Sequence, residues 1–167
     1  MTAALAGCSA THPHQGTGPL GYPGNPHNRD ILCLPDLHGQ PETVGIDVIR
    51  NNGHAPLVID RFALSTPRHL ALVGGYVVPG RFAVGQWESF PPPVGKLTKG
   101  VQWASRHAPA GARVLSGHYI NPVLGLKPTG HIGSTAAAEV FYHVGSVHYV
   151  WKSPVKIFIK VPPANCS

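Results

Sequence analysis

Apolar segments of strand length, each bounded by turn-forming residues, recur along most of this chain. Within them apolar and polar residues alternate, or apolar residues follow one another, as is typical of half-buried and fully buried strands. No segment shows the period of a convincing amphipathic helix. The pattern therefore predicts an all-β protein, an antiparallel β-sandwich of about seven to eight strands. The clearest segments are 31–34, 43–50, 56–64, 69–78, 139–144, 147–152 and 155–161, and shorter ones lie at 98–103, 113–120 and 124–127.

The clearest local prediction is a hairpin that turns at Gly145-Ser146. Glycine at the first position of a two-residue turn is typical of type II′, whose twist suits antiparallel strands. A slip of one residue would exchange the two faces of both strands, so the apolar pattern supports one register. In this register one face carries residues suited to a core: Val140, Tyr142, Val144, Val147, Tyr149 and Trp151. The other face carries three cross-strand pairs: Glu139 with Lys152, Phe141 with Val150, and His143 with His148.

Residues 43–50 predict a strand with one face in solvent. Its even-numbered positions from Val44 to Val48 are apolar and form the expected buried face, whereas Asp47 lies on the other face. The following Asn-Asn-Gly sequence is a strong turn signal. In the next segment the alternation becomes irregular near Asp60-Arg61.

Composition supports this fold class and limits the function. Gly (20) and Pro (18) are abundant in the 167 residues, and both disfavour helices. The net charge of +6 comes from scattered cations, whereas nucleic-acid binding needs a clustered basic surface, so we expect no nucleic-acid partner. The length predicts one domain, expected at residues 30–167.

The first residues resemble the end of an export signal. Leu5-Ala6-Gly7 followed by Cys8 is typical of lipoprotein signals, in which the cysteine thiol is acylated. We therefore expect residues 1–8 to be the remnant of a signal peptide and residues 9–29 to form a flexible Pro/Gly/His-rich tether. The four residues before this motif are too few for a complete export signal. Either translation starts further upstream, or the match is chance.

If Cys8 carries a lipid, two cysteines remain, Cys33 and Cys166, near the two ends of the domain. An exported protein lies in an oxidising compartment, where such a pair is expected to form a disulfide. The alternative is two separate thiols, because sequence alone does not show whether the two Cα atoms approach each other.

On these features the chain resembles exported bacterial lipoproteins, especially actinobacterial ones of unknown function, that carry an immunoglobulin-like or cupredoxin-like sandwich. The resemblance rests on the residues around Cys8, on the turn at 51–57 and on the ending at 142–161. It implies an extracytoplasmic domain held at the cell membrane by a lipid on Cys8. The implied role is non-catalytic binding or scaffolding in the cell envelope, with another envelope protein as a partner.

The 11 histidines suggest a different function. His143 and His148, if paired across the hairpin, have Cβ atoms about 4.5–5.5 Å apart, which allows both rings to bind one copper or zinc ion. Such a site needs a third or fourth ligand. A blue-copper site is not expected, because no cysteine lies in a suitable position. The alternative is a half-exposed histidine pair that binds no metal.

Catalysis has less support in the sequence, and we expect no enzyme. Ser116 and His118 lie close in the chain, but no Gly-x-Ser-x-Gly elbow is present. The acidic residues are dispersed and form no recognisable acid–base pair.

The middle of the chain, residues 81–124, is the least regular region, because a run of three prolines at 91–93 cannot donate to a β-ladder. Trp87, Phe90 and Trp103 lie in it. Exposed aromatic residues of this kind could bind a partner protein. The alternative is a long loop that these side chains hold against the sandwich.

Overall fold

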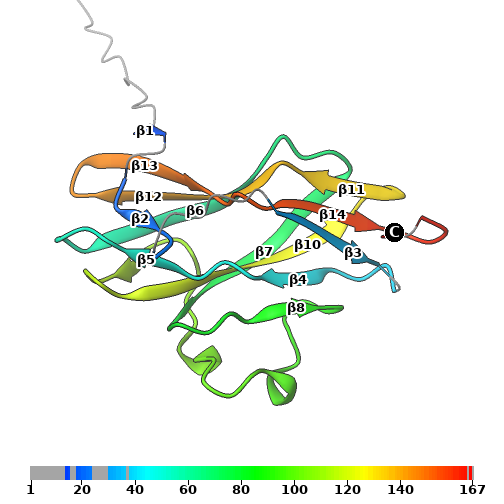
Figure 1. Cartoon of the computed structure of the whole chain (residues 1–167), viewed down its shortest axis with the longest axis horizontal. Helices are drawn as coiled ribbons and strands as arrows, with labels where there is room; N and C mark the ends of the chain where they lie inside the picture. The colour runs from blue at the N-terminus through cyan, green and yellow to red at the C-terminus, as the bar shows by residue number, and fades with distance from the viewer. Residues whose placement is uncertain (1–13, 16–17, 24–29, 37, 165, 167) are drawn as a thin grey trace, which may run out of the picture.

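The computed structural model describes residues 14–15, 18–23, 30–36, 38–164 and 166, and these form strands and short 3₁₀ turns (Figure 1). Within these residues no helix has the length and apolar composition needed to cross a bilayer. The 3₁₀ helices are η1 (Val94–Lys96) and η2 (Trp103–Ser105). The strands are β1 (His14–Gln15), β2 (Leu20–Gly21), β3 (Ile31–Pro35), β4 (Glu42–Gly45), β5 (Ile49–Asn51), β6 (Leu57–Ser65), β7 (Leu70–Pro79), β8 (Gly85–Trp87), β9 (Ala112–Val114), β10 (Tyr119–Pro128), β11 (Ile132–Thr135), β12 (Ala137–Val144), β13 (Val147–Lys152) and β14 (Lys156–Lys160).

The strands form three sheets around a shared core. Sheet A has the order β1-β13-β12-β6-β9, sheet B has the order β2-β5-β10-β4-β8 with β7 also paired to β10, and sheet C has the order β11-β14-β3. Figure 1 shows sheet A above sheet B, with sheet C on the right, where the C-terminus is marked. The largest apolar cluster takes buried residues from all three sheets, among them Ile59, Leu126 and Ile159.

This arrangement confirms an all-β, sandwich-like protein and corrects two details. The described residues contain more strand segments than the seven to eight expected, because the segment at 43–50 is two strands and several short strands, such as β2, β8 and β11, carry no pattern that predicts them. The pairing is also not wholly antiparallel, since β1 runs parallel to β13 and β14 runs parallel to β3.

The hairpin prediction is confirmed in its register. All six predicted pairs are present, from Glu139 opposite Lys152 to Val144 opposite Val147. Gly145 has a φ of 57°, as the first position of a type II′ turn requires. The assignment of faces holds for Val140 and Tyr142, which are both 1% exposed. It fails for Val147, which is 41% exposed beside the turn.

The predicted strand at 43–50 is two strands, β4 and β5, separated by residues 46–48. Its second face is not in solvent: Ile49 is fully buried and Asp47 is 7% exposed. Asp47 is held by polar partners, since its carboxylate accepts from the Tyr22 hydroxyl and its carbonyl accepts from the Asn121 side-chain amide. Burial raises the pKa of the Asp47 carboxyl.

The irregular middle covers the outer face of sheet B. Val78 and Val123 from the sheet, with Val84 and Trp103 from the covering segment, form a second apolar cluster. Sheet B is therefore buried on both faces, which explains why most residues of β10 are buried. The strand expected at 98–103 is wrong, because this segment leads into the 3₁₀ helix η2.

The ordered domain begins earlier than the expected boundary at Asp30. Leu20 is 4% exposed within the main core, and its amide donates to the Tyr142 hydroxyl at 3.2 Å. Strand β2 pairs with β5, so residues 18–23 belong to the domain and not to a tether. Cys8 and the rest of the expected signal remnant lie outside the described residues.

The predicted disulfide is present. Cys33 on β3 is bonded to Cys166, 133 residues later, with their Cα atoms 5.7 Å apart. Strand β14, which precedes Cys166, is the parallel neighbour of β3 in sheet C. The bond therefore links the C-terminal residues that follow β14 to β3.

Candidate metal centre

Three neighbouring strands of sheet A each contribute one side chain to a small polar cluster on its outer face. Asp60 comes from β6, His143 from β12 and His148 from β13, and these strands are adjacent in the order β13-β12-β6. The hairpin register places His143 directly opposite His148. On its other side His143 lies opposite Val58.

Asp60 lies at a β-bulge in the pairing of β6 with β12. Phe141 pairs with Arg61 and Tyr142 with Ile59, so Asp60 is the extra residue of β6. A bulge of this kind redirects a side chain and interrupts the alternation of the strand. Ile59 and Phe62 are buried on the inner face, and the two residues between them are not.

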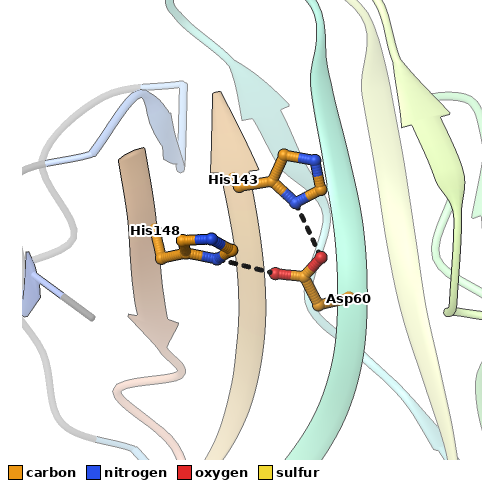
Figure 2. A group of neighbouring side chains, drawn as sticks. All are labelled: Asp60, His143 and His148. Carbon is orange, nitrogen blue, oxygen red and sulfur yellow. Dashed lines mark hydrogen bonds and ion pairs between the residues drawn. The ribbon is translucent and has the colours of Figure 1, made fainter. Parts of the chain in front are cut away.

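The three side chains converge closely (Figure 2). The Nδ1 atom of His143 lies 2.7 Å from Oδ1 of Asp60, and Nδ1 of His148 lies 3.5 Å from Oδ2 of the same carboxylate. The two imidazole centroids are 5.3 Å apart, and the rings are inclined at 47°. The side chains of His143, Asp60 and His148 are 29%, 33% and 43% exposed, so the cluster is accessible to a solvated ion.

These distances suit a tetrahedral transition-metal ion. Each residue offers one nitrogen or oxygen ligand atom, and the three atoms lie within 4.8 Å of one another. Metal–ligand bonds of about 2.0–2.1 Å at the tetrahedral angle separate neighbouring ligand atoms by about 3.3 Å. The contacts of 2.7 and 3.5 Å reach different oxygens of Asp60, and the limit of 4.8 Å on one ligand atom from each residue leaves room for the tetrahedral spacing. Three protein ligands would leave the fourth position open to water or another ligand.

A hollow of about 320 Å³ borders the cluster on the Asp60 side. Its lining includes Arg61, Phe62, Gly74 and Pro109 beside Asp60. The Arg61 guanidinium does not reach over Asp60, because it lies on the Phe141 ring, 3.6 Å from the centroid. The carboxylate is therefore left to the two imidazoles.

The sequence predicted the histidine pair but not its carboxylate partner. His143 and His148 follow from the turn alone, because hairpin pairing is local. Asp60 is 83 residues from His143, and in the sequence it is only one of several dispersed acidic residues. Its only signal was the broken alternation near Asp60-Arg61, which is the mark of the bulge.

The three aromatic residues proposed as a partner-binding surface pack on the domain itself. Trp103 is 5% exposed and lies in the second apolar cluster, so it is not available as an exposed anchor. The Trp87 indole donates to the Val84 carbonyl at 2.9 Å and packs against the same cluster.

The Phe90 ring packs directly on two glycines. Gly74 and Gly125 are paired across β7 and β10, and an added Cβ on either would come within 2.8 Å of the Phe90 ring. Tyr76 stacks on the same ring, with the centroids 5.7 Å apart. These contacts support the alternative reading, in which the aromatic side chains hold the loop against sheet B.

The geometry around Ser116 offers no nucleophile–base pair. Its hydroxyl donates to the Gly53 carbonyl at 2.6 Å. A serine is activated when its hydroxyl faces a general base such as an imidazole, and here the hydroxyl proton is directed to a backbone oxygen.

No protein-family model matches the sequence, and a comparison with curated proteins finds no match.

Proposed function

We propose that this chain is an extracytoplasmic binding domain whose ligand is a divalent transition metal, Zn²⁺ or Cu²⁺, held by Asp60, His143 and His148. The convergence of two imidazoles and one carboxylate from three strands carries the proposal. Neutral imidazole suits both metals, and a carboxylate completes a nitrogen–oxygen set that either ion accepts. The open fourth position favours exchange of the ion over permanent burial.

The two cysteines within the described residues do not compete for this metal. Cys33 and Cys166 are bonded to each other, so neither offers a thiolate. The site therefore differs from a blue-copper centre, which needs a cysteine sulfur beside its histidines. On the Irving–Williams order we expect Cu²⁺ to bind more tightly than Zn²⁺.

The proposal includes a location outside the cytoplasm. A disulfide persists in oxidising compartments, and the sequence around Cys8 is typical of a lipidation site. We propose that a lipid on Cys8 anchors the domain to the cell membrane, that the sandwich is immunoglobulin-like, and that the role is non-catalytic. Delivery of the ion to another cell-envelope protein, or scaffolding of one, fits this placement.

Calorimetric titration with Cu²⁺ and Zn²⁺ tests the metal site. The wild type is compared with the double variant His143→Ala/His148→Ala and with His54→Ala, which removes an exposed histidine outside the cluster. We expect one binding event that the double variant loses and the control keeps. Equal binding by all three proteins would reject the site.

Mass spectrometry of the protein from its native cell tests the anchor. We expect an acylated N-terminal cysteine at position 8. An unmodified N-terminus that retains residues before Cys8 would reject the lipid anchor and leave the metal site standing.

A further inference from the structure

Two acidic side chains lie inside the sandwich, where the strand patterns call for apolar residues. The first is Asp36, which follows β3 and continues its ladder, since its amide donates to the Lys160 carbonyl of β14 at 2.9 Å. Side chains on one face of a strand recur at every second residue. Leu34 is 6% exposed in the main core, and Asp36, two residues later, is 2% exposed.

The second is Glu42, at the start of β4. It lies opposite Leu126 of β10, and Leu126 is fully buried in the main core. Val44, two residues further along β4, belongs to the same core. Glu42 is therefore on the inner face of sheet B and is 3% exposed. Asp36 follows β3 of sheet C and Glu42 begins β4 of sheet B, so the two lie at the end of the domain where β3 leads into β4. Figure 1 shows this connection between the two strands.

Each carboxylate has a buried oxygen that no group in the described residues satisfies. Oδ1 of Asp36 accepts from the amides of His38 and Gly39 at 3.1 and 2.6 Å, whereas its Oδ2 has no hydrogen-bond partner. Oε1 of Glu42 also has none. A buried, unpaired carboxylate oxygen is costly, and two facing the same interior are more so. Such a pair needs a cation or a proton.

A third carboxylate lies nearby. Trp87 of β8 pairs with Thr43 of β4, which brings the next residue, Glu88, beside Glu42. Burial, the charge of Asp36 and the charge of Glu88 together raise the pKa of the Glu42 carboxyl to about 7. The Glu88 side chain is 61% exposed and its Oε2 lies 3.3 Å from Nε2 of His38, so it borders the pair from the solvent side.

We propose that Asp36 and Glu42 bind a hard divalent cation, with Ca²⁺ as the best-fitting ion, and that the charge of Glu88 attracts the ion from the solvent side. Ca²⁺ takes carboxylate oxygens in flexible geometry and tolerates several of them, unlike a transition metal that prefers imidazole. The cation satisfies both orphan oxygens and joins sheet C to sheet B. This site shares no residue with Asp60, His143 and His148, and its ligand set is all oxygen.

The test measures Ca²⁺ binding by chelator-treated full-length protein at pH 8, by calorimetry and by thermal unfolding. A ligand that binds only the folded state raises Tm with its concentration. We expect Ca²⁺ to raise the Tm of the wild type. Glu42→Gln should lose this effect or bind Ca²⁺ at least tenfold more weakly.

Three further variants make the result specific. Glu88→Gln changes an exposed side chain, so it should fold normally and bind Ca²⁺ several-fold more weakly. Glu139→Gln, which removes an acid paired with Lys152 elsewhere, should bind as the wild type does. The double variant His143→Ala/His148→Ala should keep its Ca²⁺ response, whether or not the histidine site binds a transition metal.

Two outcomes would overturn the proposal. One is a wild-type Tm that Ca²⁺ leaves unchanged at pH 8, which would mean that a proton alone satisfies the pair. The other is equal Ca²⁺ affinity in the wild type, Glu42→Gln and Glu88→Gln.

Discussion

Asp60 and His143 are 83 residues apart in the chain, and their side chains meet at 2.7 Å. Ile59 is buried on the inner face, so alternation directs Asp60 outward, toward His143 and His148. The register shift between the Ile59 and Arg61 pairings then keeps Arg61 on the outer face as well and returns Phe62 to the core. The pairing of β6 with β12 therefore adds a carboxylate to the hairpin histidine pair.

Replacement of Asp60 tests whether the carboxylate is a ligand. Asp60→Asn keeps the size of the side chain but removes the charge that a divalent ion needs. We expect Zn²⁺ affinity to fall by at least tenfold in calorimetry, with little change in Tm, since the residue is partly exposed. Unchanged affinity would mean that the two histidines bind the ion without Asp60.

The histidine pair of this site could be predicted, because it depends only on local sequence. A turn and a period of two residues define the hairpin, and both are visible in residues 139–152. Asp60 could not be placed, because its position depends on which strand lies beside β12 and where that pairing slips. Such pairing is settled by long-range packing, which one sequence does not encode as a local pattern.

The same distinction explains the rest of the fold. Segments 56–64, 69–78 and 155–161 were predicted within one or two residues, because each carries its own apolar period. Leu20 was missed because a two-residue strand has no period to detect. The covering loop was predicted only as irregular, since Phe90 is fixed by glycines on β7 and β10 and not by its neighbours in sequence.

The disulfide should contribute strongly to stability. The chain-entropy model gives about 5 kcal/mol for closing a loop of this length, as an upper value. We expect the double variant Cys33→Ser/Cys166→Ser to lose up to about that much free energy of unfolding in urea titration. The same titration on the wild type in a reductant should give a similar loss. A loss below about 1 kcal/mol would mean that the core alone holds β3 and the C-terminal end together.

The packing of Phe90 is a second test of the fold. Phe90→Ala removes the ring that covers Gly74 and Gly125, and we expect a loss of about 1–3 kcal/mol, below the range for a fully buried phenylalanine. Phe82→Ala is the matched control, because Phe82 is 53% exposed and should matter less. If the two variants unfold at the same urea concentration, Phe90 does not fix the loop.

Glu42 predicts a pH dependence of stability in the absence of added cations. Its carboxyl has a pKa raised from 4.5 to about 7 in the folded protein, so the folded state holds this proton more tightly than the unfolded chain. The stabilisation from this proton is complete below about pH 4.5 and is lost as the pH rises through about 7. At about 1.4 kcal/mol per pH unit, the loss amounts to at most about 3.5 kcal/mol.

The measurement is urea unfolding of chelator-treated protein from pH 5 to pH 8, with Glu42→Gln beside the wild type. The amide has no proton to lose, so the variant should gain stability relative to the wild type as the pH rises. Groups far from residue 42 affect both proteins alike, so the difference between the two proteins reports residue 42 together with its coupling to Asp36 and Glu88. A difference that stays constant across this range would mean that Glu42 ionises in the folded protein as it does in the unfolded chain. Added Ca²⁺ should remove much of the wild-type decline, because the bound ion takes the place of the proton between Asp36 and Glu42.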